Sequence, residues 1–332
     1  MSFDGAASVT REMKIFSGSA NRQLAQDICE LLQRPLGEAE VSTFKNGETR
    51  VRIEEHVRGR DVFVVQPTSA PADHHIIELS LMIDALKRAS AGRITAVMPY
   101  YGYAKQEKKT TGREPISAKL VANFITVAGA DRVLAIDLHA PAIQGFFDIP
   151  VDNLTAMPLL ADHLHEQNFA DVVVVSPDTG GVARANDFRT RIGASLAIIS
   201  KHRPEPDQAK VLDMVGEVEG KVAVIVDDII STGGTLHEAA ELLYQRGATE
   251  IYVYATHAAL ADEAPNVLRE SRLTRVTVTD TIPVPQAMRD SKIGVLSVAG
   301  LLANAISRIH QDSSVSALFK QPRFRQAELI PS

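Results

Sequence analysis

The chain has 332 residues, 45% of them hydrophobic and 23% charged, a balance typical of a globular protein with room for two domains of ordinary size. Its net charge of −6 gives no reason to expect nucleic-acid binding through a basic surface. No apolar run approaches the roughly 18 residues of a membrane span, so we expect no membrane partner. A single cysteine, Cys29, excludes an internal disulfide and favours a cytoplasmic location.

The first half of the chain alternates apolar runs of strand type with longer runs of helical spacing. The pair Asn46-Gly47 predicts a hairpin, whose tip is charged and aromatic. A loop over residues 99–113 carries three tyrosines and four cations, which could hold a nucleotide by stacking and charge pairing or form a plain solvated loop. Strands are expected near 14–16, 38–43, 50–54, 61–65, 93–98 and 132–136, and helices near 21–32, 74–90 and 116–127.

The second half continues the alternation, which predicts an α/β fold with mainly parallel sheets. Residues 144–150 indicate an irregular turn, and residues 201–206 a cationic loop marked by prolines. Strands are expected near 171–175, 196–199, 221–226, 250–257 and 275–279, and helices near 158–168, 182–191, 236–246 and 296–310.

Two stretches resemble each other internally. Residues 61–100 and 221–257 both follow the pattern of strand, polar turn, helix, small-residue turn and strand. We infer two similar domains, 10–155 and 156–320, related by internal duplication. Acids and a glycine pair are found in the second copy alone, so we expect the first to lend shape and loops.

The second copy predicts a phosphate site. Asp227 and Asp228 stand where a valine-rich strand is expected to end, and the turn Ser231-Thr-Gly-Gly-Thr235 leads into a helix. Free amides and the helix dipole favour an anion at such a turn. Carboxylates repel phosphate, so they suit the hydroxyls of a phosphorylated sugar, or a cation. The alternative is an ordinary strand-to-helix turn with acids near the helix start.

Other polar residues also follow expected strands. His139 and Asp178 could together hold a divalent cation, although His is unusual for magnesium and is more often structural. Lys201 and Arg203 could stabilise charge in phosphoryl transfer, or could be solvated. The chain lacks the Gly-x-x-x-x-Gly-Lys-Ser/Thr, Gly-x-Gly-x-x-Gly and His-Glu-x-x-His motifs, which argues against P-loop, Rossmann and zincin readings.

Together these stretches resemble the class I ribose-phosphate pyrophosphokinases, also called phosphoribosyl pyrophosphate synthetases, over roughly residues 13–319. The resemblance is carried by Phe44-Lys-Asn-Gly-Glu48, Pro99-Tyr-Tyr-Gly-Tyr-Ala-Lys-Gln106, Arg113-Glu-Pro-Ile-Ser-Ala-Lys119, Asp137-Leu-His-Ala-Pro141, the run 144–153, Ser176-Pro-Asp-Thr-Gly-Gly181, Lys201-His-Arg-Pro204 and the run 226–235.

The resemblance implies two phosphoribosyltransferase-like domains and transfer of pyrophosphate from ATP to the 1-hydroxyl of ribose 5-phosphate, which gives AMP and serves nucleotide biosynthesis. It implies Mg²⁺ as cofactor and a homo-oligomer, a hexamer built from dimers. The implied residues are Asp227 and Asp228 for the ribose hydroxyls; Ser231, Thr232, Gly233, Gly234 and Thr235 for the 5-phosphate; Phe44, Asn46, Gly47, Glu48, Lys105 and Gln106 for ATP; His139 and Asp178 for the metal, with His139 also at the catalytic centre; and Lys201 and Arg203 for catalysis.

Three residues depart from the family pattern. Asn46 and Ser231 stand where aspartate is common, and Lys105 where arginine is common. Together with the altered spelling of residues 108–113, these departures put the allosteric response in doubt more than the chemistry. Two other functions stay open: a phosphoribosyltransferase that consumes phosphoribosyl pyrophosphate, and a non-catalytic regulatory subunit of a synthetase complex.

Overall fold

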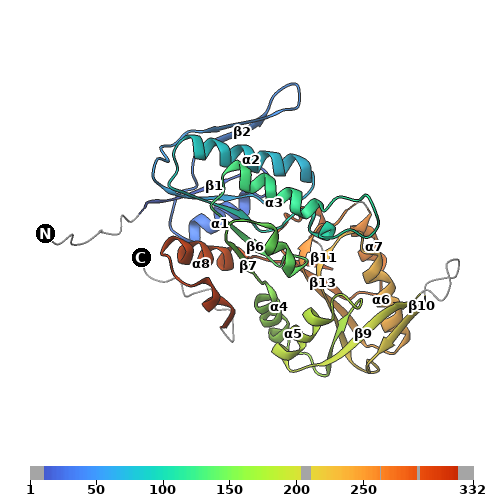
Figure 1. Cartoon of the computed structure of the whole chain (residues 1–332). Helices are drawn as coiled ribbons and strands as arrows, with labels where there is room; N and C mark the ends of the chain where they lie inside the picture. The colour runs from blue at the N-terminus through green and yellow to red at the C-terminus, as the bar shows by residue number, and fades with distance from the viewer. Residues whose placement is uncertain (1–10, 203–210, 262, 290–291, 321–332) are drawn as a thin grey trace. The chain divides into compact units, whose positions relative to one another are not determined.

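The structure, a computed structural model, describes residues 11–202, 211–261, 263–289 and 292–320 (Figure 1). The chain divides into two compact units. Unit 1 runs to Asn153 and regains Leu302–Val315, and unit 2 holds Leu154–Leu301 and Ser316–Ser332. The expected domain ranges, 10–155 and 156–320, are a simple cut of the chain, whereas unit 1 is assembled from two separate segments.

Unit 1 is built on a five-stranded sheet of order β1-β4-β5-β6-β7, in which β1, β4, β5 and β6 pair in parallel. A separate antiparallel hairpin pairs β2 with β3 and, in Figure 1, extends beyond the helices of the unit. The elements are β1 (Met13–Ser17), α1 (Arg22–Leu31), β2 (Ala39–Thr43), β3 (Thr49–Ile53), β4 (Asp61–Val65), α2 (Ala72–Arg88), β5 (Arg93–Met98), α3 (Ser117–Ala128), β6 (Arg132–Ile136) and β7 (Val151–Leu154).

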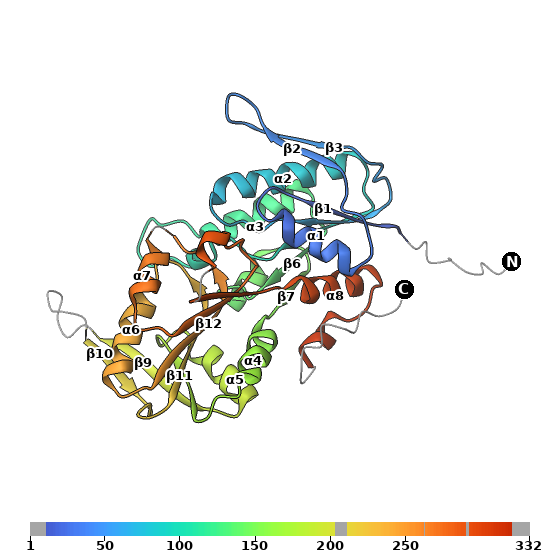
Figure 2. The ribbon, with the colours of Figure 1, turned by 180° about the vertical axis from the view of Figure 1, so that it is seen from behind.

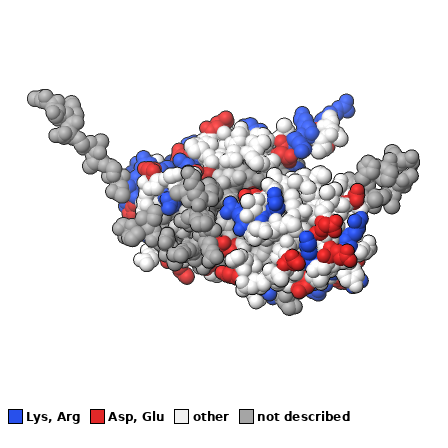
Figure 3. Space-filling model, turned by 90° about the horizontal axis from the view of Figure 1, so that it is seen from below, with Lys and Arg blue, Asp and Glu red and all other residues white. Residues whose placement is uncertain are grey.

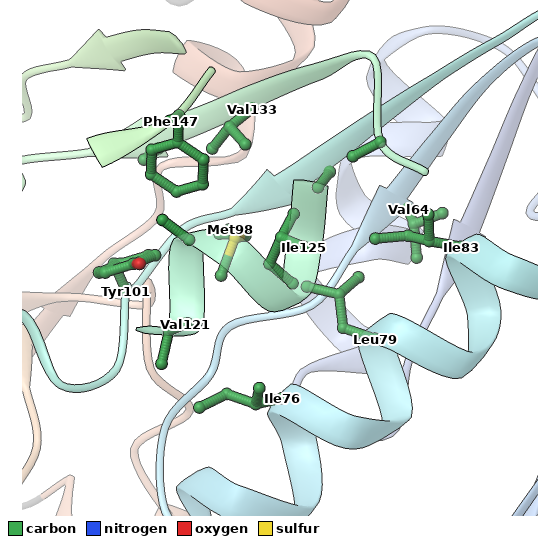
Figure 4. Close-up of a cluster of buried hydrophobic side chains, with 14 of the residues drawn as sticks. Val64, Ile76, Leu79, Ile83, Met98, Tyr101, Val121, Ile125, Val133 and Phe147 are labelled. Atoms are coloured by element: carbon green, nitrogen blue, oxygen red, sulfur yellow. The ribbon is translucent and has the colours of Figure 1, made fainter. Parts of the chain in front are cut away.

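Helices cover both faces of this sheet, with α2 and α3 on one side and α1 on the other (Figures 1 and 2). Alternate residues of the central strands point to opposite faces, and those facing α2 and α3 form one core with Leu79, Ile83, Val121 and Ile125 (Figure 4). β4 is buried along its whole length, and after Asp61 its residues form the continuous apolar run typical of parallel sheets. Cys29 is buried in α1, as its helical setting predicts.

Unit 2 is built on a seven-stranded sheet of order β10-β9-β8-β11-β12-β13-β14, parallel except for β9 with β10. One face packs against α4 and α5, and the other against α6 and α7. The elements are α4 (Met157–Glu166), β8 (Val172–Ser176), α5 (Val182–Ile192), β9 (Ser195–His202), β10 (Val211–Val215), β11 (Val222–Ile230), α6 (Gly234–Gln245), β12 (Glu250–Ala258), α7 (Ala264–Glu270), β13 (Arg275–Thr279) and β14 (Ile293–Leu296). The last helix, α8 (Ala299–His310), follows β14 and belongs to unit 1 from Leu302 on.

The predicted α/β class with mainly parallel sheets is confirmed, and the two sheets share one connectivity. In unit 1 the order β1-β4-β5-β6-β7 corresponds to β8-β11-β12-β13-β14 in unit 2. The predicted internal resemblance therefore maps β4-α2-β5 onto β11-α6-β12. The strands differ at one edge, where unit 2 adds β9 and β10 to the sheet and unit 1 has its separate hairpin instead.

Several expectations for local structure were wrong. The acids do not end their strand, because β11 continues to Ile230 and stays paired with β12 at Ile229 and Ile230. Lys201 lies in β9 rather than in a loop. Residues 141–146 form a 3-10 helix, and residues 293–296 form β14 before α8 begins at Ala299.

Candidate active site

The two acids lie on neighbouring positions of β11, whose alternating residues pack on opposite faces of the unit 2 sheet. Val222, Val224 and Val226 join the cluster with α4 and α5, and Ala223 and Ile225 join the cluster with α6. By this alternation Asp227 and Asp228 should project to different faces. The neighbouring strand β8 pairs with β11 no further than Val175 opposite Ile225, so the β8 side of β11 is open beside the acids.

Arg184 of α5 bridges the two carboxylates. Its Nη1 lies 3.1 Å from Asp227 Oδ1, and its Nη2 lies 3.0 Å from Asp228 Oδ1. The Asp228 side chain is 5% exposed, whereas Asp227 and Arg184 are about one-fifth exposed. The sequence analysis assigned no role to Arg184; the usable signal was a cation one turn into the helix that follows Asp178-Thr-Gly-Gly181.

The Asp228 carboxyl influences the ionisation of Asp227. Burial, together with the charge and hydrogen bond of the Asp228 carboxyl, raises the pKa of Asp227 to about 7, against the opposing effect of Arg184. Asp227 Oδ1 also accepts a hydrogen bond from the backbone N–H of Asp228 at 2.8 Å. One face of the Asp227 carboxylate is thus fixed by the protein, and its exposed part can accept a hydrogen bond from a ligand.

The turn after β11, Ser231–Thr235, has a backbone that suits an anion, and we call it the anion turn. Gly233 occupies the N-cap position of α6 with φ of 79°, and it supplies no capping side chain. Because this left-handed conformation favours glycine, the backbone can turn sharply and present the amides of the first helical turn. Thr232 is exposed, and Ser231, Gly234 and Thr235 are half-buried. The predicted residues Ser231–Thr235 thus lie on the same chain segment as both acids, immediately beyond β11.

A second polar loop follows β8, the strand next to β11. Asp178 is exposed, its Oδ1 accepts the Gly181 N–H at 2.9 Å, and Ser176 Oγ donates to the Asp178 carbonyl at 2.7 Å. This loop leads into α5, the helix that carries Arg184. The carboxyl ends of β8 and β11 therefore gather Asp178, Arg184, Asp227 and the anion turn at one edge of the unit 2 sheet.

The corresponding edge of unit 1 is closed by its own side chains. Gln66 comes directly after β4, the strand that corresponds to β11 with its acids. Its Nε2 donates to Glu78 Oε1 at 2.6 Å. The same carboxylate accepts the Ser19 N–H at 2.6 Å and the Ser19 hydroxyl at 2.7 Å. Gln66 is fully buried and Glu78 is 1% exposed, so α2 itself satisfies the donors of the β1–α1 turn. This supports the prediction that the phosphate site with paired acids belongs to the second copy alone.

The predicted ATP residues lie in unit 1, on two segments. The hairpin tip holds Phe44, Asn46, Gly47 and Glu48, all exposed, with Asn46 Oδ1 accepting the Glu48 N–H at 3.2 Å. The loop after β5 holds Lys105 and Gln106 in a short 3-10 helix. Both side chains are exposed.

Tyr101 and Thr68 anchor the loop after β5. The Tyr101 hydroxyl donates to the Ala118 carbonyl at 2.7 Å, and the Gly102 N–H donates to Thr68 Oγ1 at 2.7 Å. A side chain at position 102 would meet the Thr68 carbonyl at 2.4 Å, so glycine is required at that position. The loop therefore leaves β5 along a fixed path before Lys105.

The remaining predicted residues are placed only in part. His139 is half-buried after β6 in unit 1, whereas Asp178 belongs to unit 2. Lys201 lies near the end of β9, and Arg203 lies outside the described residues. Among the described residues no group of three or more His, Cys, Asp or Glu side chains is arranged to hold a metal ion, and no described helix has the length and apolarity needed to span a bilayer.

Comparison with known proteins defines the class. Residues 13–129 match the N-terminal domain of ribose phosphate pyrophosphokinase, and residues 201–320 match the phosphoribosyl synthetase-associated domain. Ribose-phosphate pyrophosphokinase from Caldanaerobacter subterraneus subsp. tengcongensis is 52% identical over 94% of this chain and 99% of its own length. The Burkholderia pseudomallei protein of the same name is 50% identical over 93% and 98%.

A solved structure agrees in fold. The phosphoribosylpyrophosphate synthetase from Mycobacterium smegmatis superposes with a TM-score of 0.87 at 43% identity, covering 91% of this chain and all of its own. The fold is that of a protein of two phosphoribosyltransferase-like domains. The chain belongs to the ribose-phosphate pyrophosphokinase family, and it is an enzyme.

Proposed function

We propose that the chain transfers the pyrophosphoryl group of ATP to the 1-hydroxyl of ribose 5-phosphate. The ribose 1-oxygen bonds to the β-phosphorus, and the bond between that phosphorus and the oxygen that bridges it to the α-phosphate breaks. The bridging oxygen leaves with AMP, and the hydroxyl proton is released. The product is 5-phosphoribosyl 1-pyrophosphate. The observation that carries this proposal is the joining of an anion turn and two carboxylates on one strand–turn–helix segment of unit 2.

The acceptor would lie along that segment. Its 5-phosphate would bind the turn Ser231–Thr235, where helix amides and the helix dipole attract an anion. Its ribose hydroxyls would donate to Asp227 and Asp228. This arrangement separates the carboxylates from the phosphate, which removes the electrostatic conflict between the two groups.

The donor would use residues of unit 1. The exposed ring of Phe44 suits stacking on an adenine base, and Lys105 and Gln106 supply a charge and an amide on a loop of fixed origin. Asn46, Gly47 and Glu48 complete the proposed ATP contacts on the hairpin tip. Lys201 and Arg203 would act on charge that develops during transfer, since phosphoryl chemistry depends mainly on positioning and charge stabilisation.

Magnesium fits the side chains present. Mg²⁺ in nucleotide sites uses one or two protein carboxylates together with substrate phosphates and water, and Asp178 offers an exposed carboxylate fixed at one oxygen. His139 would be a further contact at the metal–ATP centre, and it is the weaker ligand because Mg²⁺ prefers oxygen to imidazole nitrogen. When bound, the ion would neutralise charge on the ATP phosphates.

The test mixes purified protein, magnesium, ATP and ribose 5-phosphate and follows AMP. A synthetase releases one AMP for each phosphoribosyl pyrophosphate formed. Failure to form AMP while both substrates bind would indicate a regulatory subunit, and consumption of added phosphoribosyl pyrophosphate with a nucleobase would indicate a phosphoribosyltransferase.

Lys201→Ala tests the proposed catalytic charge. A cation that acts mainly in the transition state lowers the barrier without strengthening substrate binding in the ground state. We therefore expect kcat to fall by about 100-fold or more while KM for ribose 5-phosphate changes little. A raised KM at unchanged kcat would assign Lys201 to binding alone.

We also propose that the chain forms a homo-oligomer in the cytoplasm, a hexamer by resemblance. The oligomer is supported by an apolar surface on the packed helices α2 and α3. Five large side chains there are 39–80% exposed: Ile77, Leu81, Leu120, Phe124 and Val127. Such surfaces typically mark interfaces.

Phe124→Glu should shift the mass in light scattering to a smaller species, whereas Tyr244→Glu, on α6, should not. An unchanged mass for Phe124→Glu would exclude this surface as the interface.

A further inference from the structure

Arg184 contacts both carboxylates of the acceptor site through different nitrogens. The two bonds, 3.1 Å to Asp227 and 3.0 Å to Asp228, use Nη1 and Nη2 of one planar guanidinium. Adjacent residues of a strand normally direct their side chains to opposite faces. A single cation that reaches both carboxylates therefore fixes an arrangement that the strand alone would not produce.

The position of Arg184 follows from the ladder of β11. Because β8 stops opposite Ile225, α5 can place a side chain across the open side of β11 at the level of the acids. The helix itself is held to the sheet by Ala185 and Phe188, which are fully buried. Arg184 thus extends from a rigid support, and its planar fork has a defined direction.

The contacts of Asp227 show what the bridge leaves for a ligand. Its Oδ1 is bound from two sides, by Arg184 and by the Asp228 N–H. Its side chain is still about one-fifth exposed, whereas that of Asp228 is 5% exposed. The protein therefore holds one carboxylate oxygen, and a hydroxyl that approaches from solvent meets Asp227 in a fixed orientation.

We propose that Arg184 is a positioning residue for the acceptor sugar, which orients the Asp227 and Asp228 carboxylates toward the ribose hydroxyls. This inference rests on the proposed assignment of the acids to the ribose. Arg184 offsets the repulsion between two neighbouring carboxylates, and its two-nitrogen fork sets the direction of both. A lysine would supply the charge but, as a point charge, could not reproduce the two-point geometry.

The experiment compares the full-length wild-type protein with Arg184→Gln and Arg184→Lys in AMP formation. For Arg184→Gln we expect KM for ribose 5-phosphate to rise about 30-fold or more, equivalent to about 2 kcal/mol, with KM for ATP changed less than threefold. Arg184→Lys should recover part of the loss. Arg191→Gln, a change on the exposed side of the same helix at an ion pair with Asp187, should match the wild type.

A double-mutant cycle separates positioning from folding. If Arg184 acts through the two acids, adding Arg184→Gln to Asp227→Asn should raise KM for ribose 5-phosphate by clearly less than the roughly 30-fold expected in the wild-type background, because one of the two groups that it orients is already altered. Full additivity of the two changes would overturn the proposal, as would equal effects on both substrates or no recovery by lysine. Thermal unfolding of each variant identifies any that fail to fold.

The outcome is distinct from that of the proposed function. If the wild-type protein forms no AMP, the proposed function fails. Direct binding of ribose 5-phosphate by calorimetry then still tests Arg184, with the same expected weakening of about 30-fold. If the wild type forms AMP and Arg184→Gln retains its KM for ribose 5-phosphate, the positioning role fails while the proposed function stands.

Discussion

Asp227 shows at the scale of one residue how a site opposes stability. Burial and the neighbouring Asp228 carboxyl raise its pKa to about 7, far above the roughly 3.9 of an aspartate in an unfolded chain. The folded protein therefore holds the proton more tightly than the unfolded protein does. The tighter proton binding stabilises the fold fully below about pH 4, and this stabilisation is lost as the pH rises through about 7.

Asp227→Asn should remove the cost of ionising this carboxyl in the folded, ligand-free protein. We expect the variant to be more stable than the wild type at pH 8, by on the order of 2 kcal/mol, and to show little advantage at pH 4, where the wild-type carboxyl is protonated. Arg184 keeps Asp228 as its partner in the variant. Unfolding in urea at the two pH values measures the difference; a variant that is less stable at pH 8 would contradict this reasoning.

At the scale of elements, the sequence predicted strands best where they are buried and apolar throughout. Residues 61–65, 93–98, 132–136 and 275–279 were placed with the bounds that the structure has. The short strands β7, β10 and β14 and the seven-residue α7 were not predicted, since four to seven residues give too little periodicity to stand out. Their existence depends on neighbouring strands and helices.

The end of β11 shows why a site is harder to predict than a fold. Two acids would ordinarily mark the end of a buried strand, but β12 offers partners as far as Ala258, opposite Ile230, and Arg184 supplies the opposing charge. Both features come from distant parts of the chain. The acids and the turn Ser231–Thr235 could be proposed as a site from the sequence, whereas the cation that bridges the acids required the packing of α5 on the sheet.

The loop after β5 provides a prediction at this scale. Gly102→Ala would place a methyl group 2.4 Å from the Thr68 carbonyl, so the loop must shift before it reaches Lys105 and Gln106. We expect KM for ATP to rise about tenfold, since small displacements of positioning groups are costly. KM for ribose 5-phosphate should change much less.

Gly112→Ala is the matched control for that change. It lies farther along the same connection, and a side chain there meets open space. Equal effects of the two substitutions on KM for ATP would mean that steric contact with Thr68 does not set the path of the loop.

At the scale of the whole molecule, the chain leaves unit 1 after Asn153 and returns to it at Leu302. The return is held by a polar cluster at the amino ends of β4 and β5. Arg93 Nε and Nη2 donate to the two oxygens of Asp61 at 2.7 Å, and Nη2 also donates to the Ile309 carbonyl at 2.8 Å. His310 Nδ1 lies 2.7 Å from Asp61 Oδ2. The cluster therefore fastens α8 to the sheet edge opposite the one where the proposed ATP loop leaves β5.

Charge elsewhere on the surface has a different character. Figure 3 shows acidic and basic side chains interspersed among uncharged ones on one face, and exposed pairs such as Arg88 with Asp84 contribute little to stability. Asp61 differs because it is 1% exposed. A buried carboxylate that loses its charge leaves Arg93 with the exposed Asp312 alone, whose Oδ1 lies 2.8 Å from Arg93 Nη1, and breaking a buried pair costs roughly 3–5 kcal/mol.

Asp61→Asn should therefore destabilise the protein by roughly 3 kcal/mol at pH 7 and leave KM for ATP nearly unchanged, because within unit 1 the cluster lies at the sheet edge opposite the one where the proposed ATP loop leaves β5. Burial alone would raise the pKa of Asp61, but the hydrogen bonds and charges of Arg93 and His310 lower it below the usual range. The stabilisation is thus present above about pH 4 and is lost as the pH falls through the depressed pKa. Unfolding in urea measures the prediction: the difference in free energy of unfolding between the wild type and Asp61→Asn should narrow from pH 7 toward pH 3. Asp84→Asn provides the exposed control, expected to cost less than about 1 kcal/mol; a gap that stays constant with pH would mean that Asp61 stabilises α8 through shape rather than charge.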